Sequence, residues 1–235
     1  MSLRPADTVR HAEIDGARVI LDLNAEAYRI LDDVASVMWA VLTGEAGAAR
    51  SLDALGARYD VEPARLRTDL DAFARRCLAE GLLAPDDARA VAPPPPLERA
   101  RYPVPHVLGA LRSLVATQWR LRRTGFRATY DRYAAIPAGT STARLPAALA
   151  TYVQAENVFV AGRAPDDCLV RSLSLYRFLR SAGIPAEHVL GVRRFPFQAH
   201  AWVECDGSPL LDDSRRRRFT PLARIGVAHA AGAGA

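Results

Sequence analysis

The chain has 235 residues, half of them apolar, which is enough to bury the core of one large domain or of two small ones. Its formal net charge is +5, and because no lysine occurs, all 31 basic residues are arginine. The N-terminal residues hold no apolar segment of signal-peptide type, and no apolar run approaches the ~20 residues that span a bilayer. We therefore expect a soluble, cytoplasmic protein.

Three cysteines, Cys77, Cys168 and Cys205, are scattered along the chain without CxxC spacing. An odd number in this arrangement argues against a disulfide framework and against a structural zinc site. We expect a reducing compartment, no metal and no cofactor. Cys77 and Cys205 are expected to be small buried hydrophobes.

The charge changes sign along the chain. Residues 1–92 carry 11 Arg against 16 acidic residues, net −5, whereas residues 93–235 carry 20 Arg against 10, net +10. The change falls at "AVAPPPPLERARYPVP", residues 90–105, whose six prolines favour an extended spacer. We therefore divide the chain into a domain over residues 1–88, a linker over residues 89–105 and a domain over residues 106–235.

The first domain begins with strand patterns and continues with helical ones. In residues 12–23, "AEIDGARVILDL" predicts a hairpin around Asp15-Gly16, and "EAYRIL" predicts a third strand. Helices are predicted from Asp32 to Gly44, over residues 51–60, and from Pro63, which suits a first turn, to Gly81. Three strands followed by three helices make a winged-helix-like unit.

DNA binding is disfavoured for this unit because phosphate contact needs a basic face and the segment is acidic. A third strand with an open edge beside a helix instead offers a groove where an extended peptide can add as a further strand. The arrangement resembles the peptide-recognition domain of ribosomal peptide modification systems, which is related to the peptide chaperone of pyrroloquinoline quinone biosynthesis. The resemblance implies contacts to a leader peptide from Tyr28, Arg29, Ile30, Leu31, Leu66, Leu70 and Phe73.

The second domain opens with helical patterns over residues 107–126 and 145–160. A third helix is predicted from Cys168 to Gly183, preceded by Asp166 and Asp167 as capping residues. Cys168 then lies in the first helical turn, where unpaired backbone N–H groups and the macrodipole favour a thiolate. A nucleophilic cysteine is chemically useful at such a position.

Two strands are predicted after this helix, in "HVLGVRR" and "HAWVECD". Period-two alternation places His200, Trp202 and Glu204 on one face of the second strand. An imidazole at a strand start can meet a helix-borne thiol, and a carboxylate on the next strand can orient the ring. Asp212 is the first choice for that carboxylate, while Asp213, Asp206 and Glu204 remain open as alternatives.

The stretch "DDCLVRSLSLYRFLRSAGIPAEHVLGVRRFPFQAHAWVECDGSPLLDD" resembles the transglutaminase-like cysteine protease of lasso peptide biosynthesis, the B protein. The resemblance covers about residues 105–225, and the first domain resembles the leader-binding domain that is fused to some B proteins. It implies an α+β fold and a Cys168, His200, Asp212 triad. Val170 stands where the family usually has proline, a difference that we do not expect to affect the chemistry.

The resemblance implies a leader peptidase that binds the leader of a ribosomally made precursor peptide and cleaves it from the core. It also implies a partner, an asparagine-synthetase-like, ATP-dependent cyclase, which joins the freed core N-terminus to a side chain. Neither nucleic acid nor membrane is expected as a partner. Two other functions remain open: an acyltransferase or transglutaminase with the same triad, and a precursor-binding module without catalysis.

Overall fold

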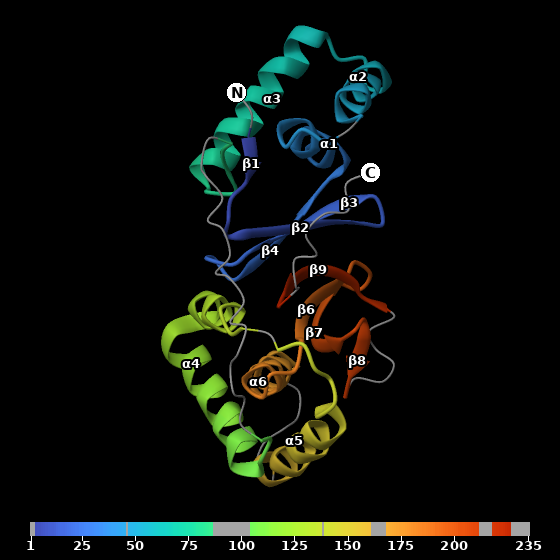
Figure 1. Cartoon of the computed structure of the whole chain (residues 1–235). Helices are drawn as coiled ribbons and strands as arrows, with labels where there is room; N and C mark the ends of the chain where they lie inside the picture. The colour runs from blue at the N-terminus through green and yellow to red at the C-terminus, as the bar shows by residue number, and fades with distance from the viewer. Residues whose placement is uncertain are drawn as a thin grey trace. The chain divides into compact units, whose positions relative to one another are not determined.

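The computed structural model describes residues 3–45, 47–86, 104–137, 139–160, 168–211 and 218–226. They fall into two compact units, Met1–Pro93 and Pro94–Ala235, each a mixture of helices and strands (Figure 1). Most of the predicted linker lies outside the described residues.

The N-terminal unit holds a three-stranded antiparallel sheet in the order β2-β3-β4, and β1 pairs with β5 as a separate ribbon. The sequence predicts the larger sheet and the three helices, but not the ribbon, whose three-residue strands are too short to show a period. The elements are β1 (Leu3–Pro5), β2 (Val9–Ile14), β3 (Ala17–Asp22), β4 (Ala27–Leu31), α1 (Asp33–Leu42), α2 (Ala48–Arg58), α3 (Pro63–Ala79) and β5 (Leu83–Pro85).

Local chemistry explains where these elements turn and begin. Asp15 and Gly16 both have positive φ, 50° and 74°, which is the geometry of a two-residue hairpin turn. The Asp32 side chain caps α1 by accepting a 2.8 Å hydrogen bond from the Ala35 N–H. Helix α1 then packs against β3 and β4, and its Trp39 is fully buried in a core that α2 and α3 complete.

The C-terminal unit packs three helices with a four-stranded antiparallel sheet in the order β8-β7-β6-β9. Helix α6 packs against β6, β7, α4 and α5 (Figure 1). The sequence predicts α5, α6, β6 and β7, but not β9. The elements are α4 (Val107–Ala134), α5 (Leu145–Val160), α6 (Cys168–Ser181), β6 (Ala186–Arg193), β7 (Gln198–Cys205), β8 (Ser208–Leu210) and β9 (Thr220–Ile225).

The helix predicted over residues 107–126 is present up to Gly125, where the chain kinks with φ 78° and ψ 176°. A second helical segment, which the sequence does not predict, continues α4 to Ala134. The kink brings the Tyr133 hydroxyl within 2.9 Å of the Thr117 hydroxyl, 16 residues earlier. Glycine tolerates this backbone conformation because it has no Cβ. Neither α4 nor any other described helix is long and apolar enough to cross a membrane.

Candidate active site

Cys168 is the first residue of α6, as the sequence predicts, and its side chain is half-buried. The two aspartates expected to cap the helix, Asp166 and Asp167, lie outside the described residues. Helix α5 anchors the next turn, because the Tyr152 hydroxyl donates to the Arg171 carbonyl at 2.9 Å and lies 2.6 Å from the Ser174 hydroxyl. Burial raises the pKa of Tyr152 far above its usual value, so this hydroxyl stays protonated.

Strand β6 contacts the same part of α6 through a histidine that the sequence analysis did not single out. The Ser172 hydroxyl donates to the Cys168 carbonyl at 2.6 Å and lies 2.9 Å from Nε2 of His188. The His188 ring is fully buried, with the rings of Tyr130 and Tyr176 edge-on to it at 5.9 and 6.1 Å. Burial lowers the pKa of His188 to about 3, so the imidazole is neutral at physiological pH.

His200 lies near the start of β7 and is half-buried. The β6–β7 register pairs it with Gly191 and pairs Trp202 with Val189, which confirms that His200 and Trp202 share a face. The imidazole stacks on Trp202 with 5.9 Å between ring centroids and packs against Phe219 at 5.2 Å. Two aromatic rings from β7 and from the approach to β9 therefore hold the His200 ring.

Trp202 is itself fixed by an ion pair between buried Glu204 and exposed Arg224. Its indole N–H donates to Glu204 at 2.8 Å, and Arg224 donates to the other oxygen of the same carboxylate at 2.7 Å. The indole lies against Gly191, where an added Cβ would come within 2.6 Å of the ring. A glycine at position 191 therefore leaves the space that the Trp202 ring occupies when it stacks on His200.

This network bears on the open choice of the third catalytic residue. Glu204 shares the His200 face, as predicted, but its two oxygens serve Trp202 and Arg224. Asp206 follows the far end of β7, six residues and ~20 Å of extended strand from His200. Asp212 and Asp213 lie outside the described residues, directly after β8 and Leu211, so the role of Asp212 stays a prediction.

The proposed pair, Cys168 and His200, lies on two elements that pack together, α6 and β7. The register puts His188 and His200 on opposite faces of the sheet, since His200 pairs with Gly191, an odd number of residues from His188. Ser172 contacts the His188 face. The predicted contact between the Cys168 thiol and the His200 imidazole would lie at the His200 end of β7, away from the face that Ser172 contacts, and it stays a prediction.

The other two cysteines behave as the sequence predicts. None of the three cysteines forms a disulfide, and Cys77 and Cys205 are buried, only 3% exposed each. Burial is the main cause that raises the pKa of each of these two thiols. Neither environment favours a nucleophilic thiolate.

In the N-terminal unit, β4 is an edge strand, as the peptide-binding prediction requires. The Leu23 N–H donates to the carbonyl of Thr8, the residue before β2, at 2.8 Å. Because hydrogen-bonded pairs alternate along an antiparallel ladder, the backbone groups of Val19, four residues before Leu23, also point toward β2. Val19 also pairs with Ile30, and that pair is therefore not hydrogen-bonded. It follows that the backbone N–H and C=O of Ile30 point to the open edge.

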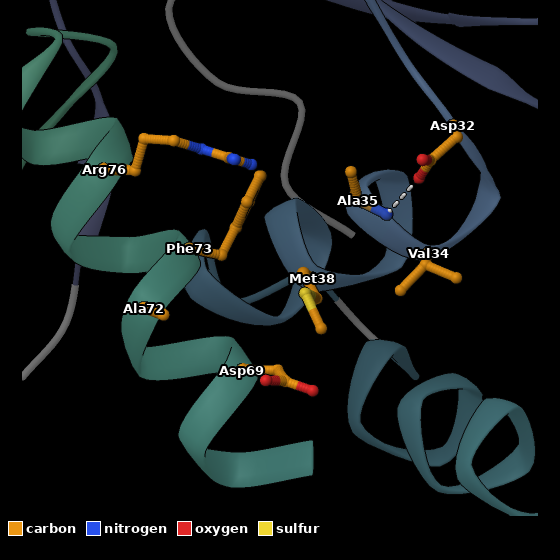
Figure 2. Close-up of a pocket in the computed structure, with 8 residues that line it drawn as sticks. All are labelled: Asp32, Val34, Ala35, Met38, Asp69, Ala72, Phe73 and Arg76. Carbon is orange, nitrogen blue, oxygen red and sulfur yellow. Dashed lines mark hydrogen bonds between the residues drawn. The ribbon is translucent and has the colours of Figure 1, made fainter. Parts of the chain in front are cut away.

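A pocket of about 280 Å³ lies between α1 and α3, next to the end of β4. Figure 2 shows the Arg76 side chain extending over the Phe73 ring, 5.4 Å from its centroid. Phe73 lines the pocket, whereas Leu66 and Leu70, from the same predicted contact set, pack against the core. The lining residues are Asp32, Val34, Ala35, Met38, Asp69, Ala72, Phe73 and Arg76.

Comparison with known proteins identifies both units. Residues 17–83 match the family of coenzyme PQQ synthesis protein D (PqqD), and residues 111–224 match the transglutaminase-like superfamily. Microcin J25-processing protein McjB from Escherichia coli is 45% identical over 60 residues. The two family matches and this relative support the resemblance to the B proteins of lasso peptide biosynthesis that the sequence indicates. The expected order, a PqqD-type domain followed by a transglutaminase-like domain, is confirmed.

The match to McjB covers 25% of this chain and 29% of the length of that relative. A solved structure, TbiB1 in complex with the TbiA(beta) leader peptide, is 30% identical, with a TM-score of 0.30. That match covers 37% of this chain and 99% of the TbiB1 chain.

Proposed function

We propose that the chain is a cytoplasmic leader peptidase, which binds the leader of a lasso peptide precursor and cleaves it from the core. One observation carries the proposal: Cys168 is the first residue of α6, and α6 packs against β7, the strand that holds His200. His200 is the sheet histidine suited to proton transfer, because it is half-exposed whereas His188 is buried and neutral.

In this mechanism the Cys168 thiol gives its proton to His200, and the thiolate attacks the carbonyl carbon of the peptide bond between leader and core. The imidazolium returns the proton to the leaving nitrogen, which frees the core amine and leaves the leader as a thioester on Cys168. Water, activated by the same imidazole, releases the leader acid. Asp212 would hold the ring in the reactive tautomer.

The two domains divide the work. The PqqD-type unit presents the outward backbone groups of Ile30 at an open edge and an apolar pocket beside it, which suits an extended leader with an apolar side chain. The freed core amine is the group that the partner, an asparagine-synthetase-like, ATP-dependent cyclase, would join to a core carboxylate.

The masses of the products distinguish this function from its rivals. Wild-type protein incubated with the precursor, and with the cyclase present, is expected to give a leader acid and a linear core whose masses sum to precursor plus one water. Closure of the core by the cyclase would then remove one water, so that the leader acid and the cyclised core sum to the mass of the precursor. A leader that carries an added amine would indicate an acyltransferase. Intact precursor that stays bound would indicate a binding module.

Leader binding through the β4 edge predicts a specific effect of proline. Ile30→Pro removes an outward N–H without breaking the β3–β4 ladder, so it is expected to weaken leader affinity ~10-fold, measured by fluorescence anisotropy of a labelled leader. Glu13→Pro is the matched control, because Glu13 holds the same outward position on the opposite edge strand, β2. Equal loss in both variants, or in neither, would contradict binding at β4.

A further inference from the structure

Ser172 and His188 connect the first turn of α6 to the buried side of β6. Ser172 is 5% exposed and His188 is fully buried, so no solvent competes for the hydrogen bonds between them. The Ser172 hydroxyl has two short contacts, to the Cys168 carbonyl at 2.6 Å and to His188 Nε2 at 2.9 Å, and a longer one to the Leu169 carbonyl at 3.3 Å. The serine therefore links the nucleophile's own backbone to a strand of the sheet.

The direction of these bonds follows from counting hydrogens. A serine hydroxyl has one proton, and the carbonyl of Cys168 can only accept, so that proton points to the carbonyl. His188 must then donate to Ser172 through Nε2–H, with Nδ1 as the bare nitrogen. Nδ1 of His188 has no hydrogen-bond partner among the described residues, which agrees with this tautomer. The neutral imidazole keeps the direction fixed at physiological pH.

We propose that His188 and Ser172 are positioning residues, which hold the backbone of Cys168 so that its thiol meets His200. The inference rests on the proposed function and extends it to a second histidine, which itself exchanges no proton. Without the link, the first turn of α6 loses its tie to β6, although Arg171 still bonds to Tyr152 and Glu156 of α5. A displacement of ~1 Å at a nucleophile is enough to cost ~100-fold in rate.

The test compares variants that break the link with one that keeps it, in the full chain with the cyclase present. Ser172→Ala and His188→Leu break it, whereas His188→Gln retains an amide N–H near the place of Nε2. We expect the first two to lower kcat for precursor cleavage ~10- to 100-fold with KM within ~2-fold, and His188→Gln to restore most of the loss. Because both residues act through one link, Ser172→Ala/His188→Leu should lose no more than the worse single variant.

A destabilised control separates positioning from stability. Leu190→Ala removes from the same strand a buried side chain that forms neither of the hydrogen bonds of the link, so its kcat per folded molecule should stay at the wild-type value. Wild-type kcat in Ser172→Ala, an equal loss in Leu190→Ala, or losses that multiply in the double variant would overturn the inference. Cleavage that survives Cys168→Ala would instead overturn the proposed function itself.

Discussion

Cys168→Ala protein is expected to release no measurable leader, and His200→Ala protein to release it at least ~100-fold more slowly than wild type. The first variant lacks the nucleophile. The second lacks the group that takes the thiol proton and returns one to the leaving amine. Mass spectrometry of the precursor, sampled over time with the cyclase present, measures both rates.

Chemical modification provides an independent measurement of the same thiol. Iodoacetamide is expected to modify Cys168 before the other two cysteines and to abolish cleavage, because burial raises the pKa of Cys77 and of Cys205. Cys205→Ser is the matched control and should keep turnover close to normal. Near-normal leader release by purified Cys168→Ala would show that this cysteine has a structural role only.

The aromatic contacts of His200 would fix the orientation of its ring for the proposed proton transfer. Trp202 and Phe219 pack on the ring and limit its rotation. Trp202 is in turn held by its hydrogen bond to Glu204, which Arg224 pairs with. The sequence predicts the alternation of His200, Trp202 and Glu204, because strand periodicity is a local property. It does not predict the ion pair that holds Glu204 beside Trp202. The partner in that pair is Arg224 of β9, which lies 20 residues further along the chain.

The same distinction between local and long-range structure applies to the start of α6. Its apolar stripe and the glycine beyond its end predict the helix, and therefore the place of Cys168 in the first turn. The link between Ser172 and His188 joins two elements whose own patterns say nothing of each other. A histidine that opens an apolar strand pattern gives no sign of being fully buried, and the sequence analysis accordingly missed it.

The kink inside α4 has a local signal that is ambiguous. A single glycine within a helical pattern, such as Gly125, is tolerated at a cost of ~1 kcal/mol. The contact between Thr117 and Tyr133, made across the kink, distinguishes two helical segments from one straight helix. Tertiary contacts therefore decide what the glycine does.

The burial of His188 predicts a large loss of stability in acid. Its folded-state pKa is about 3, against about 6.5 in the unfolded chain, so between these values the unfolded state binds more protons. Stability contributed by neutral His188 is thus present above pH 6.5 and is lost as pH falls toward 3. The slope reaches about 1.4 kcal/mol per pH unit, well above the effect of any single exposed group.

Guanidinium unfolding between pH 7 and pH 4 measures this slope, with His188→Gln as the variant that cannot titrate. We expect its free energy of unfolding to fall less steeply with pH than that of wild type, by about 1 kcal/mol per unit. His11 in the N-terminal unit also has a pKa lowered by burial and by Arg18, so His11→Gln reports the contribution of that unit separately. Identical slopes for wild type and His188→Gln would contradict this prediction and would mean that His188 becomes protonated without unfolding.

Protonation without unfolding would require the His188 ring to leave its site between Tyr130 and Tyr176 and to release Ser172. If cleavage were lost in acid while the slope stayed unchanged, the acid-sensitive step would lie at the start of α6.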